Sequence, residues 1–469
     1  MRFFVLILCL FLFVISAFSA GMNLPCVGAK ALSMGGAFRA IADDGSAVFW
    51  NPAGLSANDA SQVNLLGQLL LTFSTYVADD TLIAINQLFR EGTNEKIDKT
   101  FFLGNGYFTY APKKLERWRF GLGIYSPAGV GSTWDVLKEN GSGGVGKINP
   151  SEMNSMFPDS DYIMSTTESL PYKDFRGTLG CYSINPGTSY NLTNKVSLGI
   201  SAIWTFAVLD IGIPSSDYDK MQTDTGVVFQ EGEFSGESYG FNLGVLYKPN
   251  KRLSFGGNLK YQTDFSFEGD LTETVYKFYN EDLHNLGLFI GDTILSGGKL
   301  IKPPVRAYAE LSRPFELGVG SAYKLGEKLT ISLDLSYTYW SSVDSIILKS
   351  REGEQLVTMA MHWVDTYRIS VGGEYQFSAL SARLGAFYEP NPSVLDFQNL
   401  FIPEMNDRVA FTGGLGLHLK DFLLEFSAET EFFGEIIASP NFEGDFPVNI
   451  PGTYTGKVGD LILSATYIF

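Results

Sequence analysis

The sequence predicts an all-β transmembrane protein, an antiparallel outer-membrane β-barrel of about 14 strands, an even number as bacterial barrels have. The first observation is alternation: Leu329, Ile331 and Leu333 are apolar, whereas Thr330 and Ser332 between them are polar. A strand with this period lies between an apolar medium and water. A soluble β-sandwich shows the same alternation. Length separates the two, because transmembrane strands need about 9 to 11 residues and average soluble strands about 5 to 6.

The second observation is the length and spacing of the candidate strands. They lie at 61–76, 101–111, 118–127, 177–191, 195–210, 236–248, 252–268, 312–324, 328–341, 366–377, 381–389, 408–419, 422–434 and 456–469. Short turns alternate with long connections, which lie near 128–176, 211–235, 269–311, 342–365, 390–407 and 435–455. Short periplasmic turns and long extracellular loops are typical of this class, so both chain ends are expected in the periplasm.

Each strand is expected to show one face to lipid and the other to the lumen. Residues 253–267 alternate in this way, which places Phe265 and Phe267 on the apolar face. Aromatic residues near strand ends fit the girdles at the membrane interfaces, although any one of them could pack in a core. These residues are Trp118, Tyr125, Tyr339, Trp340 and Tyr375.

Composition agrees with a membrane-facing surface. Charged residues make up 18% of the chain, against about 25% in average globular domains. The net charge of −17 argues against nucleic acid as a partner, because phosphate neutralisation needs clustered Lys and Arg. Cys26 and Cys181 allow one optional disulfide, too few for a disulfide framework.

The two ends of the chain carry targeting features. Residues 1–20 have a positive start at Arg2, an apolar core and small residues before a cleavage site, which predicts a secretory signal peptide. No later apolar run approaches the roughly 20 residues of a membrane helix. The last strand ends in Phe469 and resembles the signature recognised by the barrel assembly machinery. We therefore expect a Gram-negative outer-membrane location.

Residues 21–60 do not alternate like a strand and carry two distinctive passages, Ser-Met-Gly-Gly-Ala-Phe at 33–38 and Asn-Pro-Ala-Gly-Leu at 51–55. This stretch resembles the N-terminal hatch of the FadL/TodX family of long-chain fatty acid and aromatic hydrocarbon transporters. Residues 125–134, 313–341 and 384–408 resemble later passages of that family, although Glu404 with Met405 departs from its usual Pro-Asp. The resemblance covers essentially the whole mature chain and implies a hatch at 21–60 that plugs a barrel at 61–469.

The Asn51-Pro52-Ala53-Gly54 box has a physical interpretation of its own. Pro52 fixes φ and biases Asn51 towards extended geometry, while Gly54 permits a left-handed turn. The box therefore predicts a tight, non-helical corner, with a role as hatch or gate implied by the resemblance. An ordinary turn before the first strand is the alternative.

The resemblance also implies a transport mechanism. Extracellular loops would capture a hydrophobic small molecule, a lumen pocket would bind it, and the hatch would move. Release would then run sideways into the outer membrane beside an inward kink in the third strand. We assign this lateral opening to Gly121, Gly123, Pro127 and Gly129, because strand Pro and Gly mark kinks and unpaired edges; Pro127 could also simply begin the following loop. We expect a monomer surrounded by outer-membrane lipid and lipopolysaccharide.

Two groups of residues are candidates for ligand contact. Apolar residues at helical spacing in one long loop predict an amphipathic capture helix, unless they only pack on one another: Val275, Tyr279, Leu283, Leu286 and Ile290. In the lumen, Lys260 or Arg368 could pair with a fatty acid carboxylate. Both could instead belong to a network of mutually neutralised lumen charges.

Two rival functions remain open. A general porin for polar solutes is one, although a hatch of about 40 residues argues against an open lumen. An outer-membrane lipid-acting enzyme is the other, since nucleophilic catalysis needs a base beside a serine. The candidate bases are His284, His362 and His418. No metal-ligand spacing occurs, and we expect neither a metal nor a cofactor.

Overall fold

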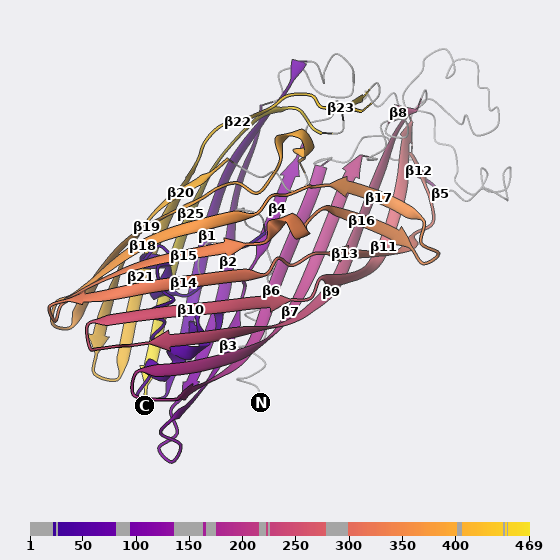
Figure 1. The fold of residues 1–469 in the computed structure, drawn as a ribbon. Coiled ribbons are helices and arrows are strands. Elements are labelled where there is room, and N and C mark those ends of the chain that lie inside the picture. The colour runs from indigo at the N-terminus through magenta and orange to yellow at the C-terminus, as the bar shows by residue number, and fades with distance from the viewer. Residues whose placement is uncertain are drawn as a thin grey trace, which may run out of the picture.

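The computed structural model describes residues 22–24, 27–80, 94–135, 163–165, 175–214, 222–223, 226–277, 299–400, 406–443, 446–447 and 449–469. The predicted signal peptide (residues 1–20) and Cys26 therefore lie outside the described residues. The strands form a closed antiparallel barrel with 14 positions around its wall (Figure 1). The fold class expected from alternation and strand length is confirmed.

Several wall positions consist of two consecutive strands. In order around the barrel the wall contains β1 (Gln62–Ala78), β2 (Asn94–Tyr110), β3 (Trp118–Tyr125) with β4 (Gly129–Trp134), β6 (Phe175–Asn191), β7 (Val196–Pro214), β9 (Gly226–Tyr247), β10 (Leu253–Gln262) with β11 (Phe265–Lys277), β13 (Val305–Leu311) with β14 (Glu316–Leu325), β15 (Leu329–Thr338) with β16 (Ser345–Ser350), β17 (Gln355–Ala360) with β18 (Thr366–Gln376), β19 (Leu380–Glu389), β20 (Arg408–Leu419), β21 (Phe422–Phe433) with β22 (Ile436–Ala438), and β25 (Gly452–Ile468).

The barrel closes where the last strand pairs with the first. The register runs from Gln62 opposite Ile468 to Ala78 opposite Gly452. The backbone N–H of Phe469 donates to the Ser61 carbonyl at 2.9 Å, so the C-terminus is fixed in the wall. It lies at the end of the barrel that carries the short turns, as expected (Figure 1).

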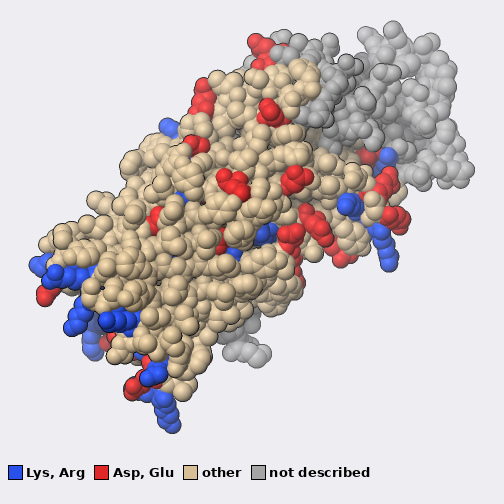
Figure 2. All heavy atoms as spheres, viewed as in Figure 1, with Lys and Arg blue, Asp and Glu red and all other residues tan. Residues whose placement is uncertain are grey.

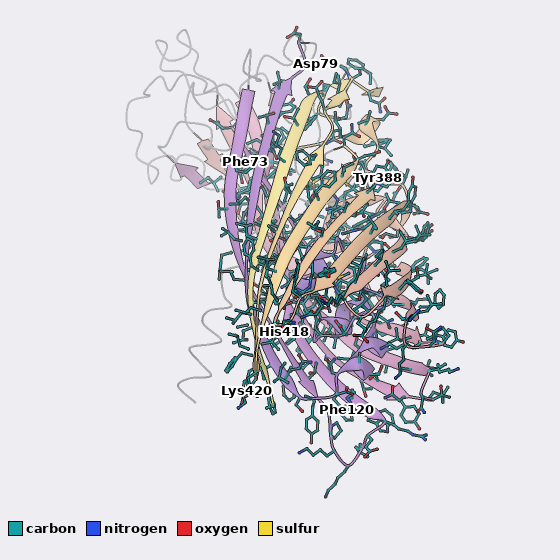
Figure 3. All side chains as sticks on the ribbon, turned by 90° about the vertical axis from the view of Figure 1, so that its left-hand side faces the viewer. Phe73, Asp79, Phe120, Tyr388, His418 and Lys420 are labelled. Carbon is teal, nitrogen blue, oxygen red and sulfur yellow. The ribbon has the colours of Figure 1, made fainter. Side chains whose placement is uncertain are left out.

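The outer surface is apolar along the middle of the barrel. On β15 the alternation is as expected, because Leu333 is 53% exposed and Ser332 is 1% exposed. Trp118, Tyr339 and Tyr375 face outwards. In Figure 3, Phe120 and Lys420 lie near the short turns, whereas Asp79 lies near the opposite end. Lys and Arg gather at the short turns in Figure 2, and Asp and Glu are more frequent elsewhere on that face.

Two of the aromatic residues expected near the girdles point inwards instead. Tyr125 is 1% exposed and Trp340 is 0% exposed. Each lies where a wall strand stops: Tyr125 ends β3, and Trp340 begins the 3₁₀ helix η2 (Trp340–Ser342). Both follow the two-residue period of their strands: Tyr125 faces inwards like Gly121 and Gly123, and Trp340 faces inwards like Ser336 and Thr338.

A break in the seventh wall position reverses the faces of its outer half. β10 ends at Gln262 and β11 begins at Phe265. Leu259 and Tyr261 face outwards as expected, but Phe265 and Phe267 are 0% and 2% exposed. The expectation that both phenylalanines face lipid is therefore wrong, because the irregular pair of residues between the strands shifts the two-residue period.

The long connections contain more strand than alternation indicated. β11, β13, β16 and β17 extend into residues expected as loops, and they pair with their neighbours in the wall. Val275 lies in β11, opposite Val228 of β9, so the capture helix expected to begin there is wrong at this position. Tyr279, Leu283, Leu286 and Ile290 lie outside the described residues.

The remaining elements are short. The helices are α2 (Ala29–Ser33), α3 (Ala47–Trp50), η1 (Pro52–Ala57), η2 and η3 (Leu395–Phe397), and the further strands are β5 (Ile163–Ser165), β8 (Gln222–Thr223), β12 (Lys299–Ile301), β23 (Phe442–Glu443) and β24 (Phe446–Pro447). Within the described part of the chain, none of the helices has the length and hydropathy needed to cross a membrane.

Candidate functional site

The N-terminal segment, residues 27–58, lies inside the ring of strands, and most of its side chains are buried. Inward-facing side chains from well-separated parts of the wall hold its backbone. Ser201 Oγ of β7 donates to the Val48 carbonyl at 2.8 Å, and Ser427 Oγ of β21 donates to the Ala29 carbonyl at 2.7 Å. The segment therefore lies in the half of the lumen nearer the short turns, where β7 and β21 begin.

Arg39 connects this segment to three strands through buried charges. The Asp334 carboxylate of β15 accepts the backbone N–H groups of Phe38 and Arg39 at 3.0 and 2.8 Å. The Arg39 guanidinium donates to Asn258 Oδ1 at 2.8 Å and forms an ion pair with Glu316. Because these groups are desolvated, removal of one partner would leave an unpaired buried charge, at a cost of about 3 to 5 kcal/mol.

The Asn51 box makes a corner against the wall. Asn51 is extended, with φ −162° and ψ 100°, and its Oδ1 accepts the Ala53 N–H at 3.2 Å. Its Nδ2 donates to the Val245 carbonyl of β9 at 3.0 Å. The corner leads directly into η1, so the expectation of a non-helical corner is wrong. Gly54 does not adopt positive φ; it is needed because a Cβ there would lie 2.3 Å from the Ala42 carbonyl oxygen.

Charged residues of the segment also meet the wall near β18. Lys30 lies 2.9 Å from Asp43 and 3.4 Å from Glu374. The neighbouring Asp44 carboxylate accepts the Ser46 N–H at 2.8 Å. Burial raises the pKa of Asp44 to about 6, against the hydrogen bonds from Ser46 that lower it. Asp44 is thus the group of this segment that changes charge near neutral pH.

The third wall position is interrupted. β3 pairs with β2 as far as Ile124 opposite Gly106, and with β6 on its other side. After the break, β4 pairs with β6 from Gly129 opposite Gly180 onwards. Among the described strands β4 has no ladder with β2. The barrel wall therefore lacks backbone pairing between β2 and β4, at the level where the chain leaves β3.

Of the four residues assigned to a lateral opening, Pro127 and Gly129 lie at this interruption. Gly121 and Gly123 do not, because both lie in β3 where it pairs on each side. Their role in the structure is different. A Cβ on either glycine would come within 2.9 Å of the Val48 side chain, so both make room for the N-terminal segment.

Residues 22–24 cover the interruption from inside. The Leu24 N–H donates to the Pro127 carbonyl at 3.1 Å, and the Gly129 N–H donates to the Met22 carbonyl at 3.0 Å. Asn23 and Ala128 form an isolated antiparallel bridge. Residues 22–24 thus supply hydrogen bonds that a neighbouring strand would supply in an intact wall.

Above the N-terminal segment the lumen is apolar. We use the name upper chamber for this apolar part of the lumen, which consists of one cluster of buried, mutually packed side chains that includes Leu70, Phe229, Phe265, Leu348, Trp340 and Trp363. Met22 and Leu24 belong to the same cluster and lie beside the interruption in the third strand. Simple alternation predicts polar lumen side chains, so this chamber was not found from the sequence. Part of it depends on the break that turns Phe265 inwards, whereas Leu70 and Phe229 face inwards from the uninterrupted strands β1 and β9.

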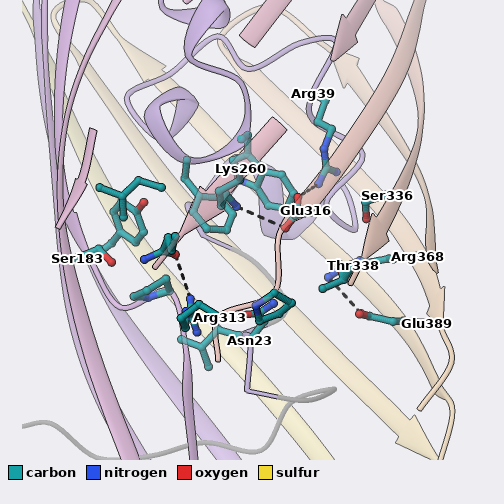
Figure 4. Close-up of a pocket in the computed structure, with 18 of the residues that line it drawn as sticks. Asn23, Arg39, Ser183, Lys260, Arg313, Glu316, Ser336, Thr338, Arg368 and Glu389 are labelled. Atoms are coloured by element: carbon teal, nitrogen blue, oxygen red, sulfur yellow. Dashed lines mark hydrogen bonds and ion pairs between the residues drawn. The ribbon is translucent and has the colours of Figure 1, made fainter. Parts of the chain in front are cut away.

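A small cavity with a free volume of about 60 Å³ lies between the N-terminal segment and the upper chamber (Figure 4). Lys260 and Arg368, expected as lumen cations, both line it. Lys260 lies 3.5 Å from Glu316, and Arg368 lies 3.9 Å from Glu389. Both cations are paired, which agrees with the alternative of a neutralised lumen network.

Arg313 also lines this cavity, and sequence reasoning missed it (Figure 4). It is 8% exposed and donates to Gln262 Oε1 at 3.2 Å, but its Nε and Nη1 atoms have no hydrogen-bond partner in the described chain. Within the same residues no carboxylate lies within 4 Å of its guanidinium. Arg313 lies between β13 and β14, so alternation could not place it.

The histidines considered as catalytic bases are scattered. His362 lies 2.7 Å from Asp344 with its side chain 46% exposed, and His418 is exposed near the β20–β21 turn. His284 lies outside the described residues. In the described ranges no group of His, Cys, Asp and Glu has an arrangement that could hold a metal ion.

Comparisons with known proteins agree with this architecture. The chain is 24% identical to a putative outer membrane protein of Neisseria meningitidis serogroup B, over 86% of this chain and 84% of that protein. It is 24% identical to the long-chain fatty acid transport protein of an Escherichia coli O6:H1 strain, over 50% of this chain and 54% of that protein.

Two solved structures share the fold over nearly the whole chain. A FadL homologue of Pseudomonas aeruginosa matches with a TM-score of 0.70 at 18% identity, covering 96% of this chain and 99% of that one. The toluene transporter TodX of P. putida matches with a TM-score of 0.66 at 17% identity, covering 95% and 99%. The family model described as outer membrane protein transport protein (OMPP1/FadL/TodX) matches residues 176–424. The chain therefore belongs to the OMPP1/FadL/TodX family of outer-membrane transport proteins.

Proposed function

We propose that this protein carries fatty acids, or hydrophobic molecules with a similar carboxylate head, passively into the outer membrane. Loops capture the ligand, the upper chamber and the cavity beneath it bind it, and the N-terminal segment moves as a hatch. The ligand then leaves sideways where the third strand is interrupted. The observation that carries the proposal is the missing ladder between β2 and β4, next to the apolar chamber.

The apolar chamber favours hydrophobic cargo over polar solutes. Transfer of apolar surface out of water contributes roughly 25 cal/mol per Å², so a chamber lined by Leu, Phe and Trp side chains favours an acyl chain. A general porin needs a polar, water-filled lumen. Here the lumen holds the buried N-terminal segment and the apolar cluster.

The interruption gives such a ligand a path that avoids water. Backbone groups of a strand edge have to be paired inside a membrane. Residues 22–24 satisfy part of this edge from inside. When the N-terminal segment shifts, these bonds are lost and the edge becomes free. An opening then connects the upper chamber to the lipid phase.

Arg313 favours an acidic ligand over a neutral hydrocarbon. A buried guanidinium with unused donors forms strong, charge-assisted hydrogen bonds with a carboxylate. The ring of Phe265 lies 5.3 Å from the guanidinium carbon and belongs to the upper chamber. A carboxylate at Arg313 with its acyl chain in the chamber would match both features.

The test is uptake of radiolabelled palmitate by a host strain that lacks its own fatty acid transporter. Ala128, which is 0% exposed at the interruption, is replaced by tryptophan, and Gly129→Leu serves as a milder variant. Ala202→Trp is the matched control, because Ala202 is exposed on the intact wall at β7. We expect uptake to fall at least tenfold in the first two variants and to stay unchanged in the control.

Planar bilayers provide the second measurement. We expect little steady ion conductance from the wild-type protein. A large steady conductance would favour the porin alternative, and normal palmitate uptake by folded Ala128→Trp protein would contradict the lateral path.

A further inference from the structure

The interruption in the third strand leaves two edges without a backbone ladder, yet two side chains reach across it. The first lies inside the barrel. Asn105 of β2 is 1% exposed, and its Oδ1 accepts the backbone N–H of Ser126 at 3.0 Å. Ser126 is the first residue after β3, where the chain leaves its ladder with β2. The Asn105 side chain therefore takes the place of a backbone acceptor.

The orientation of the Asn105 amide is fixed by a relay across two further strands. Asn105 Nδ2 donates to Gln68 Oε1 of β1 at 3.2 Å, and Gln68 Nε2 donates to Asp460 Oδ2 of β25 at 2.5 Å. Gln68 is 1% exposed and Asp460 is 0% exposed. Since the relay engages the amide nitrogen of Asn105, its carbonyl oxygen is left to face Ser126.

The second side chain lies on the membrane side. The pairing of β6 moves from Ser183 opposite Tyr125 to Gly180 opposite Gly129, so Tyr182 lies beside the break. Cys181 and Ser183 are both buried on the lumen side, and alternation directs Tyr182 to the outer face. Its hydroxyl lies close enough to the backbone of Gly104 in β2 to interact with it electrostatically. Tyr182 thus spans the opening from β6 to β2.

We propose that Asn105 and Tyr182 are positioning residues that frame the lateral opening, one holding Ser126 out of the β2 ladder and the other fastening β6 to β2 across it. This inference rests on the proposed lateral release. The two residues have opposite effects. Loss of the Tyr182 hydroxyl frees the outer fastening and widens the opening. Loss of the Asn105 acceptor leaves a buried N–H that is costly unless paired, so Ser126 re-pairs with β2 and the opening narrows.

The experiment combines hydrogen exchange with palmitate uptake, using the full-length mature protein. Asn105→Leu should change the exchange rate of the Ser126 amide at least tenfold, and Asn105→Asp, which keeps an acceptor, should restore the wild-type rate. Asn64→Leu is the control, because Asn64 bonds Ser464 and Thr466 in the intact β1–β25 wall.

Tyr182→Phe removes only a hydroxyl and should raise exchange at Gly104. Tyr388→Phe is its control. The Tyr388 hydroxyl, at the end of β19, donates to Asp407 just before β20 at 2.6 Å, away from the interruption. For uptake, we expect at least a threefold rise with Tyr182→Phe and at least a threefold fall with Asn105→Leu. Equilibrium binding of palmitate should stay within twofold for both.

The two measurements fail separately. Wild-type exchange rates at Ser126 and Gly104 in the respective variants would overturn the framing role, whatever uptake does. Altered exchange with unaltered uptake would overturn the positioning of the opening by these residues. Uptake that changes in the same direction in both variants would overturn it too, because a general loss of stability would change uptake in the same direction in both. Absence of palmitate uptake by the wild type would refute the proposed function, and exchange would still decide whether Asn105 and Tyr182 hold Ser126 and Gly104.

Discussion

Replacement of Arg313 by methionine tests whether the cavity recognises an acid. The guanidinium is buried, has one side-chain hydrogen bond in the described chain, to Gln262, and keeps two nitrogens without a partner. A carboxylate bound there would gain a charge-assisted hydrogen bond worth about 1.5 to 3 kcal/mol. Since each 1.4 kcal/mol is a factor of ten, the Kd for palmitate should rise about 10- to 150-fold in Arg313→Met.

The stability of this variant should change little. Breaking a buried ion pair is destabilising, but Arg313 forms none with a carboxylate among the described residues. Methionine has a similar apolar stem, and replacement of a buried charge by an apolar side chain is often neutral or stabilising. A loss of palmitate affinity in this variant can therefore be read as a loss of recognition. Its thermal unfolding midpoint should match that of the wild type.

The assay is equilibrium binding of palmitate and of hexadecanol, which shares the chain but lacks the carboxylate, to detergent-solubilised protein. Hexadecanol affinity should stay within twofold of wild type. Lys260→Met is the control, because Lys260 is paired with Glu316, and it should change palmitate affinity less than threefold. Equal losses for both ligands, or an unchanged Kd for palmitate, would refute the assignment of the carboxylate to Arg313.

Three further predictions concern the N-terminal segment. Gly199→Ala places a Cβ 2.2 Å from the Ala53 nitrogen. This variant should lower the free energy of unfolding by about 1 to 3 kcal/mol and speed hydrogen exchange in η1. Gly257→Ala, whose Cβ has no contact closer than 3.5 Å, should do neither. Asp334→Ala should lower the free energy of unfolding by about 3 to 5 kcal/mol, measured by denaturant titration; Asp210→Ala, which breaks a part-exposed pair with Arg176, should cost about 1 kcal/mol or less. Burial raises the pKa of Asp44 from 3.8 to about 6, so the packed segment binds a proton more tightly than the released segment does. Protection of residues 44–50 from hydrogen exchange should therefore fall between pH 4 and 6 and then level off, and Asp44→Asn should flatten this profile. A wild-type-like pH profile in Asp44→Asn would contradict this expectation.

Alternation predicted the barrel because most of the wall consists of uninterrupted strands. The faces of β15 are as expected from Leu329 to Thr338, and the positions of the short turns and of the last strand are confirmed. Each of these properties depends on residues close together in sequence. A two-residue period needs no knowledge of the rest of the chain.

The candidate site was predicted less well, because it consists of departures from that period. Phe265 and Phe267 turn inwards after the break that follows Gln262. Arg313 reaches the cavity from a similar break. Pro127 and Gly129 lie at the interruption, but Gly121 and Gly123 are paired in β3. Glycine marks both a broken strand and a close contact, and the sequence does not separate these causes.

The sequence by itself determined the outer-membrane barrel, its strand number and, through the Asn51-Pro52-Ala53-Gly54 box, its family resemblance. Only the tertiary structure decided which cations are neutralised, where the wall is unpaired and which side chains reach across that gap. Gln68, Asn105 and Asp460 lie on three strands, and Gln68 and Asp460 are 392 residues apart in the 469-residue chain. Such contacts exist only after the first and last strands have closed the barrel, so no local pattern records them.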